Sequence, residues 1–80
     1  MKTPRDLSWR DVVKALGRFG YVIVRQKGSH IRLTTQMGGE DHLAVPAHDP
    51  LRVGTLEAIV AKAALHFHKT KNQMMEELFS

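Results

Sequence analysis

The 80-residue sequence contains no cysteine. Disulfides, thiolate metal sites and cysteine catalysis are therefore excluded, and cysteine usage says nothing about the redox compartment. No stretch approaches the roughly 18 apolar residues that a membrane-spanning helix needs. The first residues lack the apolar segment of a signal peptide. We therefore expect a soluble, cytoplasmic protein with no membrane partner.

Acidic residues are also few, since 12 Lys and Arg outnumber 8 Asp and Glu and give a net charge of +4. This moderate basic bias favours polyanionic partners, nucleic acid first. Ordinary soluble domains carry a charge of this size as well. A chain this short buries only about 60% of its unfolded surface, so we expect one domain over residues 1–80 with a small core.

Apolar periodicity and turn residues predict the order α-β-β-β-α, followed by a further C-terminal helix. The expected elements are a leader at 1–7, a helix from 8 to 18 or 19, strands at 21–26, 30–35 and 42–45, a helix from 55 to about 65, and a short helix from 70. Tight turns at 27–29 and 37–40 make the sheet an antiparallel meander. The expected fold class is α+β, with a three-stranded antiparallel sheet carrying two helices on one face. The core domain is expected at about 8–65, and residues 66–80 form an extension.

Alternation of side chains along the strands predicts which residues face the helices. The expected core residues of the sheet are Val22, Val24, Ile31, Leu33, Leu43 and Val45. The opposite face is then expected to carry Arg25, His30, Arg32, Thr34 and His42, with Tyr21 and Ile23. The predicted sheet therefore has one apolar face and one basic face.

Capping residues mark the expected helix ends. Ser8 with Asp11, and Thr70 with Gln73, have the spacing of capping boxes. Gly20 is expected to end the first helix in a left-handed conformation, and Thr55 is expected to be the N-cap of the second, with Glu57 in its first turn.

An apolar stripe occupies the last helix at Met74, Met75, Leu78 and Phe79. Such stripes usually pack into a core. A helix that docks a partner through its soft methionines is the alternative. Core packing is the favoured interpretation.

The stretch 25–30 gathers several chemically useful residues. Gly28 lacks a side chain, so another backbone, such as a phosphate chain, can approach the turn closely. Arg25 and Lys27 add positive charge, and His30 belongs to the residue type that transfers protons near neutral pH. Two interpretations follow: a phosphate-binding site with acid/base chemistry, or a hairpin with a basic turn and a surface histidine. These residues alone favour the plain hairpin.

Two other kinds of site receive little support. The spacings of the histidine pairs 66/68 and 42/48 match no familiar zinc pattern, and no carboxylate completes them. A nucleophilic site built from Ser29, His30 and Asp49 is disfavoured, because adjacent residues on a strand point to opposite faces. We expect no metal and no cofactor.

Several short motifs together resemble the HicA toxins of bacterial and archaeal toxin–antitoxin modules. The motifs are Gly20-Tyr21, Arg25-Gln26-Lys27-Gly28-Ser29-His30, Val45-Pro46-Ala47-His48, and Gly54-Thr55-Leu56 leading into Ala58-Ile59. The resemblance covers about residues 12–65. The sequence departs from the family after the second long helix, where Ala64-Leu65 and a longer extension replace the usual glycine and short tail. The role of that extension is left open.

The resemblance implies a double-stranded-RNA-binding-like fold and a metal-independent ribonuclease that cleaves mRNA. It implies that His30 is the catalytic residue and that a HicB-type antitoxin binds and covers it. We expect the free protein to be monomeric. The rival interpretation is a non-catalytic RNA-binding module of the same fold, and a third is a small interaction domain that uses its Met-rich end.

A ribonuclease of this kind can use the RNA 2′-hydroxyl as the nucleophile. It then needs a proton acceptor, a proton donor and positive charge around the phosphate. His30 is expected to be the acid or base. The expected phosphate contacts and assisting groups are Lys27, the N–H groups of Gly28 and Ser29, Arg25, Arg32 and His42.

Overall fold

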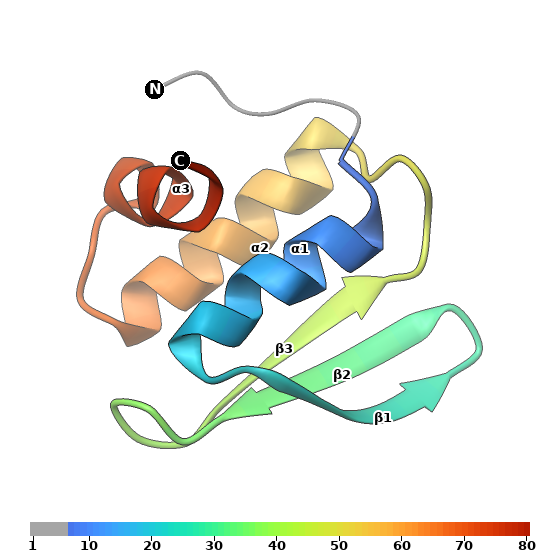
Figure 1. Cartoon of the computed structure of the whole chain (residues 1–80), viewed down its shortest axis with the longest axis horizontal. Helices are drawn as coiled ribbons and strands as arrows, with labels where there is room; N and C mark the ends of the chain where they lie inside the picture. Colours follow the sequence, from blue (N-terminus) through green and yellow to red (C-terminus); the bar gives the residue numbers. More distant parts are fainter. Residues whose placement is uncertain (1–6) are drawn as a thin grey trace.

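The computed structural model describes residues 7–80 and confirms the predicted α+β class. Its elements are α1 (Trp9–Leu16), a 3₁₀ turn η1 (Gly17–Phe19), β1 (Val22–Lys27), β2 (His30–Thr35), β3 (Asp41–Pro46), α2 (Val53–His66) and α3 (Lys71–Phe79) (Figure 1). All but the last residue of the predicted leader lies outside the described residues. Within residues 7–80, no helix is long and apolar enough to cross a membrane.

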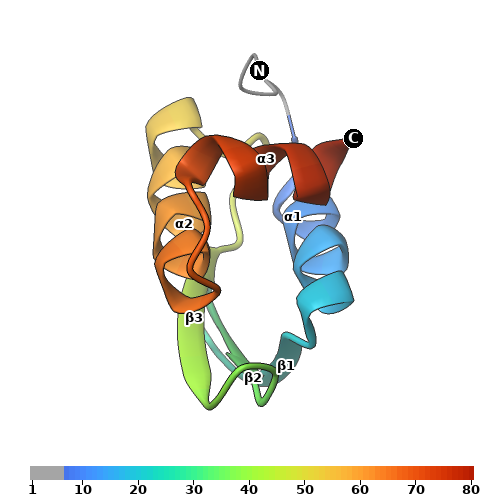
Figure 2. The same ribbon diagram turned by 90° about the vertical axis from the view of Figure 1, so that its left-hand side faces the viewer.

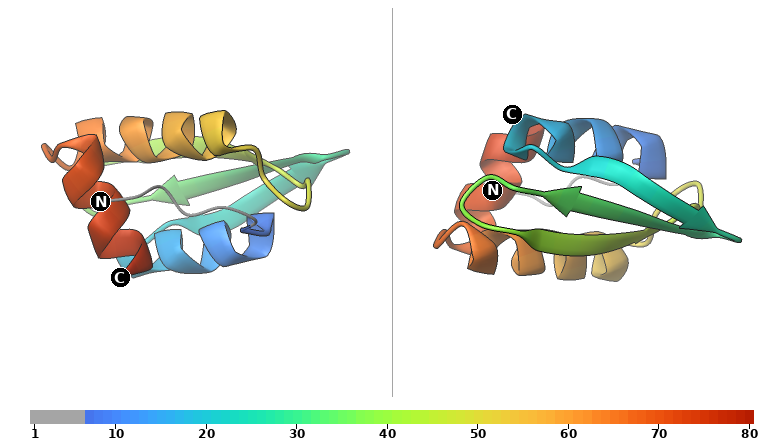
Figure 3. Two further views of the ribbon diagram at one scale, coloured as in Figure 1. Left: turned by 90° about the horizontal axis from the view of Figure 1, so that it is seen from above. Right: turned by 90° about the horizontal axis from the view of Figure 1, so that it is seen from below.

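The three strands form one antiparallel sheet in the order β1-β2-β3. Helices α1 and α2 lie side by side on one face of this sheet, and nothing in the described part of the chain covers the other face (Figures 2 and 3). The tip of the β1–β2 hairpin projects beyond the helices (Figure 3). The uncovered face is called the open face below.

Helix α1 begins as predicted, with a complete capping box between Ser8 and Asp11. It ends earlier than predicted, because Gly17 starts the 3₁₀ turn that leads to Gly20. Gly20 has a φ of 81°, and a Cβ there would lie 2.7 Å from the hydroxyl of Thr35. The predicted left-handed cap is therefore confirmed, and glycine is required there both by conformation and by close packing.

The core of the sheet agrees only partly with the prediction. Four of the expected residues are buried, namely Ile31, Leu33, Leu43 and Val45. Val22 and Val24, predicted to be buried, are 59% and 56% exposed. The prediction was wrong for β1 because this edge strand packs mainly on β2, whereas the helices pack against β3.

The prediction was also wrong for Tyr21. It was expected on the open face but is buried in the core. It precedes β1, and its hydroxyl donates a hydrogen bond of 2.6 Å to Asp41 Oδ2. Burial, together with this hydrogen bond and the negative charge of Asp41, raises the pKa of Tyr21.

Helix α2 starts two residues before the predicted N-cap Thr55. Arg52 is the N-cap, with no side-chain capping bond, and its carbonyl accepts the first helical hydrogen bond from Leu56 N–H. The early start follows from Leu51, which is buried and whose N–H donates to the Leu7 carbonyl, so the chain is already anchored there. As a result Glu57 does not belong to the first turn of α2.

Helix α3 crosses α1 and α2 on the side away from the sheet (Figure 2). The predicted capping box between Thr70 and Gln73 is present. Met74, Met75 and Leu78 are buried, and Phe79 packs partly against the same core. Core packing is therefore confirmed for this stripe, and the partner-docking interpretation of the Met-rich end is wrong.

Candidate active site

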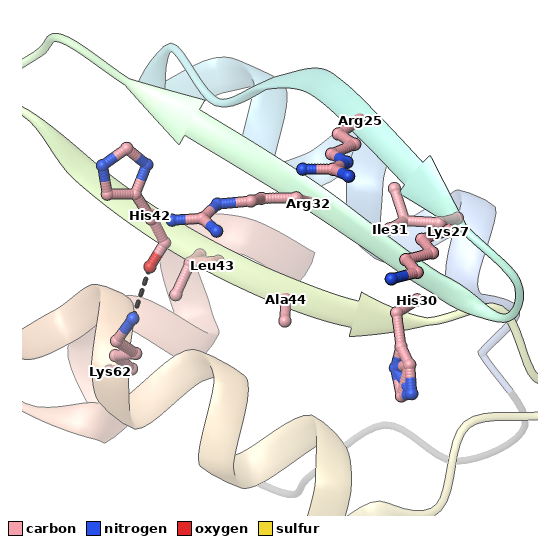
Figure 4. Close-up of a pocket in the computed structure, with 9 residues that line it drawn as sticks. All are labelled: Arg25, Lys27, His30, Ile31, Arg32, His42, Leu43, Ala44 and Lys62. Carbon is pink, nitrogen blue, oxygen red and sulfur yellow. Dashed lines mark hydrogen bonds between the residues drawn. The ribbon is translucent and has the colours of Figure 1, made fainter.

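A hollow of about 390 Å³ lies on the open face (Figure 4). All three strands and α2 contribute to it. Its lining residues are Arg25, Lys27, His30, Ile31, Arg32, His42, Leu43, Ala44 and Lys62. We call it the sheet hollow. It brings together five predicted side chains, those of Arg25, Lys27, His30, Arg32 and His42.

A β-bulge places the cations of β1 on this face. Ile23 pairs with Leu33 and Arg25 pairs with Arg32, so Val24 is an extra residue in β1. Ile23 therefore points toward the helix side, as Leu33 does, while Arg25 and Lys27 share the open face with their partners on β2. A regular strand continuing from Ile23 would turn Arg25 to the helix side instead.

His30 and Lys27 are direct cross-strand partners beside the hairpin turn. Such partners have Cβ atoms about 4.5–5.5 Å apart, and Figure 4 shows the two side chains next to each other on the open face. Both residues are exposed. A single phosphate group can therefore contact the ammonium group and the imidazole together.

The turn itself leaves room for a large ligand. Gly28 has a φ of 59°, which suits the first central position of a two-residue hairpin turn. Nothing lies within 4 Å of a Cβ built on Gly28. The Ser29 carbonyl accepts a hydrogen bond of 2.6 Å from Ala47 N–H, which ties the turn to the segment after β3.

His42 lies at the opposite end of the sheet hollow. It pairs with Thr34, four residues along β2 from His30, a separation of about 13 Å at 3.3 Å per residue. Its Nδ1 lies 2.8 Å from Thr34 Oγ1, and its Nε2 lies 3.2 Å from Glu40 Oε2. The two histidines of this face are therefore too far apart to act on one phosphate.

Lys62 is a site residue that the sequence did not predict. It comes from α2, and its ammonium group donates a hydrogen bond to the backbone carbonyl of His42 (Figure 4). The composition of α2 could have pointed to this residue. Lys62 is the one Lys or Arg within the apolar, Ala-rich helix 53–66. Side-chain alternation on the strands gave no information about which helix residue reaches the sheet edge.

The charge of the sheet hollow is strongly positive. Arg25, Lys27, Arg32 and Lys62 line it, and none of the carboxylates in residues 7–80 does. None of these cations forms an ion pair with an acidic group of residues 7–80. Unpaired cations on one face suit a polyanionic ligand.

The structure does not bring together the residues of the Ser29, His30 and Asp49 site or of a histidine metal site. Asp49 faces α1, where Oδ1 accepts from Trp9 N–H at 3.0 Å and Oδ2 lies 3.5 Å from Arg10, so it does not orient His30. His66 contacts the Met37 carbonyl at 2.9 Å through Nε2. Across residues 7–80, no three His, Asp or Glu side chains come together in a way that could hold a metal ion.

Comparison with known families decides the assignment. The family model of the HicA toxin of bacterial toxin–antitoxin systems matches residues 9–65. This chain belongs to the HicA toxin family. The match runs from the start of α1 almost to the end of α2, so it includes the whole sheet and the sheet hollow. No curated protein and no solved structure matched the chain.

Membership of the HicA family implies a protein partner, the antitoxin, for this chain. Helix α3 lies beyond the matched residues. Because α3 fills the core between α1 and α2, the extension left open by the sequence has a structural role here.

Proposed function

We propose that this HicA family member is the ribonuclease of a type II toxin–antitoxin pair, cleaving mRNA in the cytoplasm without a metal ion. One observation carries the proposal: His30 is exposed beside Lys27 in a hollow lined by four cations that form no ion pair with the acidic groups of residues 7–80. Positive charge supplies affinity for the RNA backbone. The imidazole supplies proton transfer at the same place.

The proposed reaction is attack of the RNA 2′-oxygen on the adjacent phosphorus. A P–O2′ bond forms and the P–O5′ bond breaks. The 2′-hydroxyl loses its proton to a base, and the departing 5′-oxygen gains a proton. The products are a 2′,3′-cyclic phosphate and a 5′-hydroxyl end. This chemistry needs acid/base groups and charge stabilisation, and it needs no metal or cofactor.

The residues divide this work by position. His30 transfers a proton at the scissile phosphate, and Lys27 neutralises a phosphate oxygen there. The N–H groups of Gly28 and Ser29 are the further donors at the turn. Arg25 and Arg32, paired across β1 and β2, hold the backbone next to it.

His42 takes a different part in the proposal. Its separation of about 13 Å from His30 places it near a phosphate farther along the strand, so it assists by binding. Water then serves as the second proton donor or acceptor, complementing His30. One positioned acid/base group contributes about 10²–10⁴-fold, so the enzyme is expected to be slow.

A HicB-type antitoxin is the proposed inhibitor, and it acts by covering His30. The open face is the accessible route to that residue, because α1 and α2 occupy the other side of the sheet. The free toxin is proposed to be a monomer.

The test is cleavage of single-stranded RNA by purified His30→Ala protein. We expect this variant to bind RNA with near wild-type affinity and to yield no product. Lys14→Ala is the control, since Lys14 is an exposed cation on α1, away from the open face. RNA with one 2′-deoxyribose at the cut site should resist the wild-type enzyme. Undiminished cleavage by His30→Ala overturns the catalytic assignment, and binding without any cleavage by the wild type supports the non-catalytic module instead.

A further inference from the structure

Strand β1 exposes a run of three large apolar side chains. Val22, Ile23 and Val24 are 59%, 51% and 56% exposed. The only other large hydrophobic side chains so exposed within residues 7–80 are Met37 and Leu65, each isolated in the sequence. Exposed apolar clusters of this kind mark protein interaction sites.

The same residues belong to a free strand edge. β1 pairs with β2 on one side, and no strand of residues 7–80 pairs with its other side. In an antiparallel sheet, half of the N–H and C=O groups of an edge strand point outward and remain available. Soluble proteins usually protect such edges with charges, prolines or short strands.

This edge has little of that protection. β1 is as long as β2 and β3, and its first half contains no charged residue or proline. The charges of its second half, Arg25 and Lys27, are directed to the open face by the bulge. The edge is therefore suited to accept another strand from a protein partner.

We propose that the antitoxin docks on this edge by adding an extended segment to β1. The segment should place apolar side chains beside Val22 and Ile23 and acidic side chains beside Arg25 and Lys27. The proposal rests on the antitoxin partner of the proposed function, and it does not depend on catalysis by His30. A segment bound there lies next to the sheet hollow, so the rest of the partner is positioned to cover His30.

Charge favours the antitoxin over a second copy of this chain. Full antiparallel pairing of two β1 strands would set their Arg25 residues in neighbouring rows. It would also bring together the unpaired cations of two sheet hollows. Like charges facing each other across strands are destabilising. An acidic segment meets the same edge without that repulsion.

The experiment measures binding of a purified HicB-type antitoxin to this protein. Val22→Glu and Ile23→Glu are the test variants, and Leu65→Glu is the matched control because Leu65 is 78% exposed on α2. Calorimetry should show at least about tenfold weaker binding for the two β1 variants and no change for Leu65→Glu. Cleavage of RNA by the free Ile23→Glu and Leu65→Glu variants should match the wild type.

Amide hydrogen exchange provides a readout that does not depend on substitutions. Amides of residues 22–27 should gain protection when the antitoxin binds wild-type protein. Unchanged exchange there, or unchanged affinity of both β1 variants, overturns the proposal. A concentration-dependent dimer of the free protein that Ile23→Glu abolishes assigns the edge to a second copy and also overturns it. Protection of β1 by the antitoxin in a protein that cuts no RNA leaves this proposal standing and refutes the nuclease.

Discussion

The ammonium group of Lys62 on α2 donates a hydrogen bond to the backbone carbonyl of His42 on β3. The Lys62 side chain reaches from α2 to the edge of the sheet at β3, where it lines the sheet hollow. It also places positive charge at the end of the sheet hollow that lies farthest from His30. The hollow is therefore basic along its length and not only at the hairpin turn.

Replacing Lys62 by methionine should weaken RNA binding without moving the cleavage site. The side chain keeps its length but loses its charge, so one phosphate contact disappears. For single-stranded RNA the slope of log affinity against log salt should fall in magnitude by about 0.7. Fluorescence anisotropy at several salt concentrations measures this slope. Lys14→Met should leave it unchanged, and an equal loss in both variants would remove Lys62 from the RNA contacts.

Chelation should not reduce cleavage. The proposed attack by the 2′-hydroxyl relies on His30 and on fixed cations, so RNA cutting should continue at the wild-type rate in EDTA. Gel analysis of a labelled RNA with and without chelator checks this. Activity that disappears with EDTA and returns with one added metal would contradict metal independence.

Two single-residue deletions in β1 should differ in their effect on RNA binding. Deleting Val24 removes the bulge and leaves Arg25 opposite Arg32 on the open face. Deleting Gln26 also removes the bulge, but it turns Arg25 to the helix side. We expect near wild-type binding for the first deletion and a several-fold loss for the second. Equal affinities in two folded variants would show that the face occupied by Arg25 is unimportant.

Truncating Leu78 should destabilise the domain. Leu78 is 2% exposed in the core between α1 and α2, and Leu→Ala changes at such positions cost about 2–5 kcal/mol. Urea unfolding of Leu78→Ala measures the loss. Asn72→Ala, on the exposed side of the same helix, should change the free energy of unfolding by less than about 0.5 kcal/mol. Similar small effects for both would mean that α3 is not part of the core.

Tyr21 should make the fold sensitive to alkaline pH. Its pKa is raised by burial, by its hydrogen bond to Asp41 and by the charge of Asp41. The neutral phenol therefore stabilises the folded state fully below the unfolded pKa of about 10. That stabilisation is lost as the pH rises through the higher folded value.

Urea unfolding at about pH 8 and about pH 11 tests this effect. The wild type should lose more stability between these values than Tyr21→Phe, which has no phenol to ionise. Because Tyr21 is the only tyrosine, phenolate absorbance reports its titration directly. An ordinary midpoint near pH 10 would contradict the raised pKa.

The sequence predicted the central parts of the fold better than its edge. β2 and β3 are constrained on both sides by neighbours or helices, so alternation placed Ile31, Leu33, Leu43 and Val45 correctly. In β1 both faces are partly apolar, and the strand packs mainly on β2. The extra residue Val24 changes the alternation, and no local sequence signal marks it.

The candidate site was predicted in the same uneven way. His30 and Arg32 could be assigned to one face because side chains alternate along β2. Lys27 was predicted in the turn, and the structure places it at the end of β1 opposite His30. The approach of Lys62 to His42 depends on how α2 packs beside β3, which periodicity does not specify. The separation of His30 from His42 likewise became clear only from the strand pairing.

The open face has a consequence for the topology of the substrate. The sheet hollow lies on the face of the sheet that neither α1 nor α2 covers (Figure 4). An RNA strand can settle on it sideways, so no free end has to be threaded past His30. A covalently closed, circular single-stranded RNA should therefore be opened as readily as a linear RNA of the same sequence is cut.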